Sequence, residues 1–498
     1  MASPSSNSHS EHTRDEAVLA RLGYKQEFRR EFTPLEVFGV AFSIVGLLPS
    51  IASVLFNAMP NGGPLAMVWG WLFACAFIMC IGLAMAELAS AAPTSGGLYY
   101  WTYSLASPRC RNFLSWIVGY SNTIASIAAF ASVDWACAIQ ITAAVSIASN
   151  QVYVTTNGQI YGIFAALVLS HAVLVSLGTQ ILARLQRLYI LLNVCLCFIV
   201  IIALPIATPS EFRNSASYAL GDFTNLDGWP SGFAFILSLL APLWTIGGYD
   251  SSVHMSEEAS NATTAIPWAI IGSIAISAAL GWGINVSLVF CMGSDLEGIL
   301  SSPIGQPMAQ IFYNSFGQKG ALALWSLVIV AHYTGTPVNT VWLDALLALA
   351  IGLLAFVSTQ AINAIFTLVV TSSYISYITP IATRFAFKND FKPGPFNLGK
   401  FSFPVAAIAV SWMVFMNMVF FFPTTPQTTA QEMNYTVVVL GGFMSLAVFW
   451  YYCPVYGGVH WFNGPVSNLM SAEKGQDDES ASEKTGKGRG VDVLIVDA

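Results

Sequence analysis

Charged residues are scarce in this chain of 498 residues, because Asp, Glu, Lys and Arg together make up only 9% of it. Soluble globular proteins carry about 25% charged residues. Hydrophobic residues reach 55%, and the mean hydropathy is +0.64. One water-soluble core cannot hide this much apolar surface. The composition therefore excludes an ordinary soluble protein and indicates a polytopic membrane protein, with the lipid bilayer as a partner.

Several chemical motifs are also missing. The sequence contains no HExxH, GxSxG or P-loop pattern, so we expect neither an enzyme nor an ATP-driven pump. The eight cysteines form no CxxC pair and nearly all lie in or beside apolar runs, which favours apolar packing over a metal site or disulfides. We expect no metal and no cofactor. No basic patch interleaved with aromatic residues suggests a nucleic-acid partner.

The two ends of the chain are polar. Residues 1–33 lack an apolar h-region and are therefore not a cleavable signal peptide; we expect a cytoplasmic tail. Within it, DEAVLARLGYKQEFRR is compatible with a basic amphipathic helix on the membrane surface or with a partly ordered, solvated tail. Residues 457–498 are predicted to be a second cytoplasmic tail, largely disordered. Residues 34–456 between them are predicted to form the transmembrane domain.

A window of about 19 residues identifies the apolar segments that are long enough to span a bilayer. Eleven are clear. They cover residues 34–57, 64–87, 113–147, 159–178, 183–207, 232–252, 267–292, 338–358, 361–384, 403–422 and 435–454.

A further apolar fragment, ALALWSLVIVA at 321–331, is shorter than the roughly 20 residues that a span needs. Lys and Arg gather in alternate loops, in both tails and in the loop 384–400, which are therefore predicted to be cytoplasmic. That orientation requires one more crossing between about residues 319 and 337. The charge pattern thus predicts twelve spans, whereas hydropathy supplies eleven and a fragment.

Two of the predicted spans contain helix breakers. The first reads FSIVGLLPSIASVL, with Gly46 and Pro49 at its centre, and the sixth contains Pro242 followed by TIGGYD. A lone Gly or Pro in a membrane helix often serves only packing or a kink. Two breaks at the first and sixth positions instead indicate a transporter of inverted five-helix repeats with a binding site between them. The freed N–H groups would attract a carboxylate and the freed carbonyls an ammonium or cation.

At these residues the chain resembles the amino acid–polyamine–organocation superfamily, and within it the fungal amino acid/choline permeases that include 4-aminobutyrate permeases. The resemblance spans roughly residues 15–460. It rests on LARLGYKQEFRREFTPLEVFGVAFSIVGLLPSIASVL, AELASAAPTSGGLYYWTYSLA, GGYDSSVHMSEEASNA and TGTPVNTVW. It implies an all-α fold of two inverted five-helix repeats plus two C-terminal helices.

The resemblance also implies a substrate site between spans one and six. Trp244 matches an aromatic residue that closes over the substrate in relatives, although it could instead pack between helices. Tyr249 could add to an aromatic cage for a choline-like cation. By position, the first break would hold a substrate carboxylate and the second would face its amine. The residues concerned are Gly46, Leu47, Leu48, Pro49 and Ser50 in the first break, and Thr245, Ile246, Gly247 and Gly248 in the second.

Ionisable residues in or beside the spans are candidates for proton coupling or gating, since each is costly in hydrocarbon. Asp250 is the main candidate for amine contact or coupling, against the alternative of a packed partner to a neighbouring polar group. His254 lies one turn beyond it, so an Asp–His pair is considered. Glu257 would sit at the cytoplasmic mouth as a gate or a solvated side chain, and Asp134 lies in span three.

Span eight departs from the family pattern. LWSLVIVA runs directly into HYTGTPVNT, so about 30 residues of helix and loop are missing by length. A natural deletion and a mis-assigned splice site both explain this.

We expect a secondary active transporter for amino acids or related small amines, coupled to protons, with a small zwitterionic or cationic substrate. The plasma membrane is the expected location, and an internal membrane the alternative. The alternative functions are a non-transporting nutrient sensor and a permease inactivated by the deletion.

Overall fold

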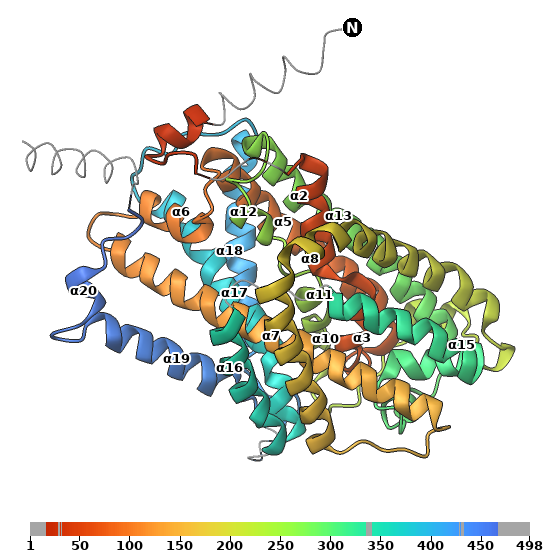
Figure 1. The fold of residues 1–498 in the computed structure, drawn as a ribbon. Coiled ribbons are helices and arrows are strands. Elements are labelled where there is room, and N and C mark those ends of the chain that lie inside the picture. Colours follow the sequence, from red (N-terminus) through yellow and green to blue (C-terminus); the bar gives the residue numbers. More distant parts are fainter. Residues whose placement is uncertain are drawn as a thin grey trace, which may run out of the picture.

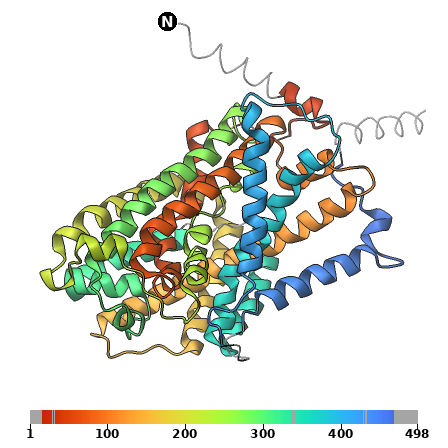
Figure 2. The same ribbon diagram turned by 180° about the vertical axis from the view of Figure 1, so that it is seen from behind.

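The computed structural model describes residues 16–27, 30, 32–334, 341–427, 429 and 433–466. These residues fold almost entirely into helices, without a β-strand among them (Figures 1 and 2). Eight of the described helical segments are long and apolar enough to cross a membrane, and three shorter apolar helices accompany them. Each of the eleven predicted segments overlaps one of these helices over most of its described length. The predicted all-α class is confirmed, and the chain is a multi-pass integral membrane protein.

The helices of the first half of the chain are α2 (Pro34–Val45), α3 (Leu47–Ala58), α4 (Gly63–Leu65), the π-helical η1 (Ala66–Gly70), α5 (Trp71–Ala91), α6 (Gly97–Leu105), α7 (Arg111–Ala148), α8 (Asn157–Ala207), η2 (Ser210–Phe212) and α9 (Ala216–Gly221). Those of the second half are α10 (Ser231–Ser238), α11 (Leu240–Thr245), α12 (Ser251–His254), α13 (Ala262–Cys291), α14 (Leu296–Leu300), α15 (Pro307–Thr334), α16 (Val341–Gly352), η3 (Leu353–Phe356), α17 (Thr359–Ala386), η4 (Gly399–Phe401), α18 (Ser402–Val419), α19 (Thr436–Tyr451) and α20 (Gly458–Trp461).

Helix α8 contains two of the candidate spans. Its 51 residues would extend about 77 Å if straight, far beyond the roughly 30 Å of a hydrocarbon core. The two apolar stretches are Asn157–Leu174 and Leu188–Ala207. Figure 1 shows these gold and olive parts running in different directions. They therefore serve as spans four and five.

Small residues allow α5 and α13 to pack closely. A Cβ on Gly82 would collide with Ile274 Cδ1, and one on Gly281 would collide with the Trp71 ring. The Trp71 indole N–H donates to the carbonyl of Ala278 at 3.0 Å. Such close approach at small residues is how membrane helices associate without a hydrophobic driving force. This pair supports α2 and α3, which carry the first break.

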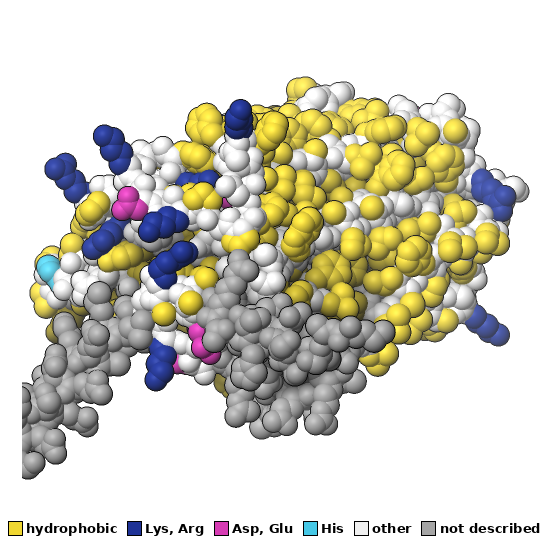
Figure 3. All heavy atoms as spheres, turned by 90° about the horizontal axis from the view of Figure 1, so that it is seen from above, with side chains coloured by type: hydrophobic (Ala, Val, Ile, Leu, Met, Phe, Trp, Pro, Cys, Tyr) yellow, Lys and Arg dark blue, Asp and Glu magenta, His cyan; other side chains and the backbone are white. Residues whose placement is uncertain are grey.

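Basic side chains are distributed unequally between the two ends of the molecule. Figure 3 shows Lys and Arg gathered at one end, beside a broad apolar face. That end carries the start of α2, helix α6 and the loop 387–401, all predicted to be cytoplasmic. Arg213 and Lys319 belong to loops predicted to be at the opposite, outer end. The distribution matches the positive-inside rule.

Helices α15 and α16 explain the conflict over the number of spans. Gly317 (φ 68°, ψ 177°) breaks α15, and the part after it ends beside Asp134 in α7. Arg111, the cytoplasmic end of α7, lies about 35 Å further along that helix. The other end of α16 returns to the outer end of α8, since Asn157 Nδ2 donates to the carbonyl of Ala355 at 3.1 Å.

The described part of α15 thus ends at the depth of Asp134, short of a complete crossing, and the segment after α16 lies beside the end of α8 at Asn157. The GTPVNT residues 335–340, part of the motif on which the resemblance rests, lie outside the described residues.

Candidate functional site

The first break is a single left-handed glycine. Helix α2 ends at Gly46 (φ 49°, ψ 55°), whose N–H donates to the carbonyl of Ser43 at 3.1 Å. The chain becomes helical again at once, because the Ser50 N–H donates to the Gly46 carbonyl at 2.9 Å. Leu47, Leu48, Pro49 and Ser50, predicted to be part of the break, therefore form the first turn of α3. The break is narrower than the sequence predicts.

Side chains satisfy the carbonyls around this break. Ser50 Oγ donates to the Val45 carbonyl at 2.7 Å, and Ser53 Oγ donates to the Pro49 carbonyl at 2.7 Å. Gln140 Nε2 of α7 adds a second bond to the Pro49 carbonyl at 3.1 Å. These bonds remove the cost of unpaired backbone groups at membrane depth.

The second break is longer and less satisfied. Helix α11 ends at Thr245 and α12 begins at Ser251, with Gly248 at φ 74° between them. The Ile246 N–H still donates to Pro242 at 3.0 Å. Among the described backbone hydrogen bonds, none reaches the next three carbonyls, 243–245. The Thr245 hydroxyl is buried and has no described partner. This break therefore offers acceptors, as a cation or ammonium site requires.

The structure brings the two breaks together. A Cβ on Gly248 would lie 2.9 Å from Ile44 Cγ2, two residues before Gly46, so the segments touch. Between α3 and α11 lies a void of about 10 Å³, which Ile51, Thr245 and other side chains line. That volume holds about one water molecule. An amino acid can enter only after α3 and α11 separate.

Trp244 lies at the end of α11, directly before the second break. Its ring packs edge-on against Phe366 of α17, with centroids 5.0 Å apart, and its indole N–H donates to Ser132 Oγ of α7 at 3.3 Å. Tyr249 is 2% exposed and lies 6.0 Å from the ring of Tyr377. The predicted aromatic residues thus flank the second break, although they also pack between helices.

A polar cavity of about 130 Å³ opens above Phe56 on the outer side. Asp227 is its charged group. Burial raises the pKa of Asp227, and the bond from Asn61 Nδ2 to Asp227 Oδ2 (2.7 Å) opposes that rise. Neither residue was named from the sequence. The amides that line the cavity are Asn57, Asn61, Gln360, Asn363 and Asn434.

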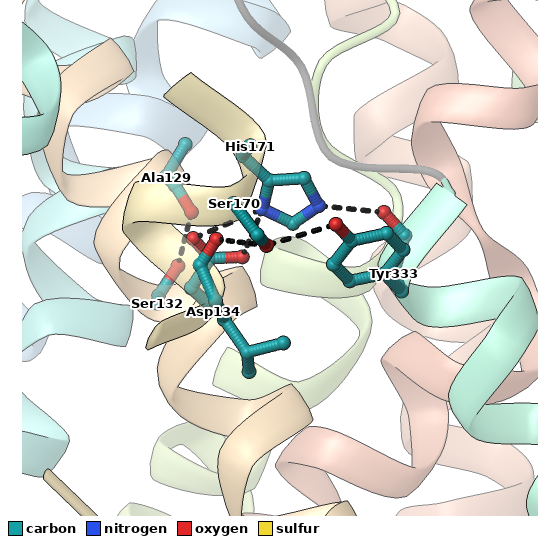
Figure 4. A network of polar contacts seen from close by, with 7 residues as sticks. Ala129, Ser132, Asp134, Ser170, His171 and Tyr333 are labelled. Atoms are coloured by element: carbon teal, nitrogen blue, oxygen red, sulfur yellow. Dashed lines mark hydrogen bonds and ion pairs between the residues drawn. The ribbon is translucent and has the colours of Figure 1, made fainter. Parts of the chain in front are cut away.

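Asp134 is completely buried and pairs with a histidine that the sequence analysis did not name. His171 Nδ1 of α8 lies 3.0 Å from Asp134 Oδ1, and its Nε2 lies 2.9 Å from the carbonyl of Tyr333 (Figure 4). The Tyr333 ring stacks on the imidazole at 4.2 Å, and its hydroxyl bonds to Ser170 at 2.8 Å. The signal that could have identified His171 from the sequence is that it is an ionisable residue inside an apolar span.

The end of α15 also reaches the first break. His332 Nδ1 lies 2.9 Å from Gln140 Oε1, and the amide nitrogen of Gln140 holds the Pro49 carbonyl. His332 Nε2 is buried without a described partner. The His332 ring, the Gln140 amide and the Pro49 carbonyl therefore link α15 to α3.

The remaining predicted gate residues lie toward the end that is predicted to be cytoplasmic. The Asp250 side chain meets the hydroxyl of Tyr377. His254 Nδ1 lies 3.0 Å from the carbonyl of Ser95, so its ring is directed to Ser95. Glu257 Oε1 accepts from the Ser95 N–H at 3.0 Å and from its hydroxyl at 2.5 Å. His254 and Glu257 thus hold the turn between α5 and α6.

A buried ion pair closes the same side. Arg384 of α17 donates to both carboxylate oxygens of Glu87 in α5, at 2.6 and 3.0 Å. Ser402 Oγ adds a bond to Glu87 Oε1 at 2.7 Å. The Glu87 side chain is 0% exposed and that of Arg384 9%. Together with Glu257 and Ser95, this pair fixes the cytoplasmic ends of the bundle.

A sequence model described as "Amino acid permease" matches residues 32–333 and 330–443. The two matched segments meet at the end of α15. Among curated relatives, the GABA-specific permease of Saccharomyces cerevisiae is 38% identical over 496 residues, covering 91% of this chain and 86% of the relative. An uncharacterized amino-acid permease of Schizosaccharomyces pombe is 36% identical over 495 residues, covering 92% and 90%.

Similarity extends to other organisms. The amino-acid permease BAT1 of Arabidopsis thaliana is 31% identical over 503 residues and covers 91% of this chain and 96% of the relative. Among solved structures, a manganese transporter of Eremococcus coleocola matches 82% of this chain and 92% of its own, with 14% identity and a TM-score of 0.49.

Proposed function

The chain belongs to the amino acid permease family and is a multi-pass membrane transporter for amino acids rather than an enzyme, and we propose that it takes up a small zwitterion or amine together with protons. The proposed location is the plasma membrane. The single observation that supports the proposed site is the contact between the two helix breaks, at Gly248 and Ile44.

The breaks differ in the polar groups they leave free, and this sets the orientation of the substrate. Carbonyls 243–245 and the Thr245 hydroxyl are the acceptors that an ammonium needs. The start of α3, residues 47–50, supplies the positive end of a helix dipole for a carboxylate. Trp244 would close the site from outside, and Gly247 and Gly248 allow the backbone to approach the substrate.

4-Aminobutyrate is the first substrate to test. The GABA-specific permease is a relative over most of the chain. A carboxylate and an ammonium separated by methylene groups fit two half-sites of opposite polarity with apolar side chains such as Ile51 between them. Asp227 in the outer cavity would favour substrates that carry an ammonium group.

Asp134 and His171 are the proposed proton carriers. They are buried, they face each other from α7 and α8, and Tyr333 of α15 contacts the imidazole. Ser132, two residues before Asp134, accepts the bond from Trp244. Closure of Trp244 over a substrate would therefore shift the same turn of α7 that carries the carboxylate. Asp250, beside Tyr377, is the alternative carrier.

A second function, binding without transport, is supported by the end of α15. The matched segments of the family model meet at residues 330–333, and the described part of α15 ends at the depth of Asp134. A chain that lacks part of span eight would keep both breaks but lose part of the helices that move during transport. A nutrient sensor or an inactive permease would behave in this way.

An uptake panel separates the two functions. Labelled amino acids, 4-aminobutyrate, choline and polyamines would be offered to transport-deficient cells that express the chain, with and without a proton gradient. Gradient-dependent accumulation supports the transporter. Binding to the purified chain without accumulation supports the sensor, provided that a version with the family's span-eight segment restored does accumulate substrate. Neither binding nor uptake of any compound would contradict both.

A further inference from the structure

A cleft of about 610 Å³ opens at the cytoplasmic end, away from the two helix breaks. Four parts of the chain form it: the N-terminal segment around Arg21 and Tyr24, the end of α5 with α6, the loop after α17, and Pro465. The cleft lies at the end where Figure 3 shows basic side chains gathered. Its volume is in the range of small-molecule sites.

The charge of the cleft is strongly positive. Arg21, Arg111, Lys388 and Lys392 line it, against one carboxylate, Asp390. The ion pairs described elsewhere in the chain are those of Arg384 and His171, so within the described residues none of these four cations has a carboxylate partner. An excess of unpaired cations in a cleft raises the local concentration of anions.

The loop that carries two of the cations is held in place. Asn389 Nδ2 donates to the carbonyls of Leu105 (3.2 Å) and Phe387 (3.1 Å). The ring of Phe391 lies 3.8 Å from the Arg384 guanidinium, which Glu87 fixes. Lys388 and Lys392 flank these anchored residues. The cations are therefore presented by a structured loop.

Aromatic side chains form the walls. The rings of Tyr24 and Tyr100 meet edge-on at 5.8 Å, and the Arg111 guanidinium lies over the Tyr103 ring at 4.5 Å. Burial, with the nearby Tyr100 and Glu257, raises the pKa of Tyr24 to about 12. Its hydroxyl therefore stays neutral at physiological pH and can donate to an anion without repelling it.

We propose that this cleft binds the phosphorylated headgroup of an anionic lipid. Basic pockets beside membrane helices on the cytoplasmic side suit phosphate monoesters on such headgroups, and aromatic residues are favoured at the interface. Free phosphorylated sugars share this chemistry and are distinguished by the test. An occupant of the cleft would bridge two elements: the N-terminal segment, whose Gln26 Nε2 donates to the Glu257 carbonyl at 2.9 Å, and the loop after α17, whose Phe391 ring lies against Arg384.

The test uses the purified full-length chain in nanodiscs. Discs of phosphatidylcholine alone are compared with discs that contain phosphatidylinositol 4,5-bisphosphate, and soluble inositol trisphosphate and inorganic phosphate are titrated separately. Native mass spectrometry counts retained lipid, and thermal unfolding reports stabilisation. Retention of the phosphorylated lipid with a rise in melting temperature is expected. Competition by inositol trisphosphate shows that the headgroup suffices, whereas lipid binding without competition shows that the acyl chains contribute.

Charge-removing variants make the test specific. At about 1 kcal/mol for each cation, Arg111→Gln should weaken lipid binding by about fivefold, and Lys388→Gln with Lys392→Gln by about 30-fold. Lys400→Gln removes a cation at the same end but outside the cleft and should bind as the unmodified chain does. Gel filtration confirms that each variant is folded. Equal binding by the cleft variants and the Lys400 control, or no preference over phosphatidylcholine, would overturn the proposal.

Discussion

His171 Nδ1 lies 3.0 Å from Asp134 Oδ1, in a pair that is 5% and 0% exposed at its two residues. The two come from different helices, α8 and α7, and both are shielded from solvent. His171 Nε2 reaches further, to the carbonyl of Tyr333. A lone charge in this position would be costly, so the contact between the two side chains is the structural basis of the proposed proton coupling.

Removing the carboxylate should uncouple transport from protons. In Asp134→Asn, we expect loss of proton-driven accumulation while exchange of labelled for unlabelled substrate continues. The variant leaves His171 without a counter-charge, so it should also lose about 3–5 kcal/mol of stability if the imidazole stays charged. Accumulation and exchange are measured side by side in proteoliposomes. Unchanged gradient dependence in Asp134→Asn and in His171→Gln would assign coupling elsewhere, with Asp250 as the next candidate.

Gly248→Ala should damage the site more than Gly46→Ala. Both glycines have a positive φ, which costs another residue about 1–2 kcal/mol. Only at Gly248 does the added Cβ also collide, at 2.9 Å from Ile44, whereas at Gly46 the nearest atoms lie at 3.7 Å. Substrate affinity and melting temperature provide the readout.

The matched control is Gly119→Ala in α7, where nothing lies within 4 Å of the new Cβ. This variant should be neutral or slightly stabilising, because Ala favours a helix. If all three variants behaved alike, contact between the two breaks would not matter for binding.

Arg384→Gln should destabilise the chain by about 3–5 kcal/mol, because Glu87 would remain buried without its charge partner. The double variant Glu87→Gln with Arg384→Gln should recover much of that loss, since amides can replace one another's hydrogen bonds. Arg109→Gln, which removes a cation from a cytoplasmic loop, is the control and should change little. Thermal unfolding of the detergent-solubilised protein measures all three. A double variant as unstable as the single one would argue against an ion-pair role.

Stability should depend on pH through Asp227. Its pKa in the folded protein is raised by burial, so the folded state binds a proton that the unfolded state has already released. Stability is therefore expected to rise as pH falls from above the raised value toward the ordinary carboxyl value. Asp227→Asn should remove this part of the dependence and raise the KM for substrates with an ammonium group. If the stability of Asp227→Asn varied with pH as that of the unmodified chain does, Asp227 would not be the source of this pH dependence.

The sequence predicted the helical class, the segments that form spans, and the position of both breaks, because apolar length and Gly–Pro interruptions are local signals. It could not predict how narrow the first break is. That depends on Ser50 bonding to the Val45 carbonyl at the end of α2 and on Ser53 bonding to the Pro49 carbonyl within α3, while Leu47–Ser50 remain helical.

Long-range pairs were beyond local signals. Asp134 was named from its cost in hydrocarbon, yet its partner His171 is set by how α7 packs against α8. Glu87 and Arg384 are 297 residues apart, and their pairing depends on the arrangement of α5 and α17. The expected Asp250–His254 pair followed from helical spacing, but the ring of His254 turns to the Ser95 carbonyl instead.

The most direct measurement is uptake of labelled 4-aminobutyrate and other amino acids into proteoliposomes that contain the purified chain, under an inward proton gradient. The account predicts accumulation above the external concentration, collapse of that accumulation by a protonophore, and loss of it in Asp134→Asn. Bound substrate without any gradient-driven accumulation by the chain as it stands would contradict coupled transport.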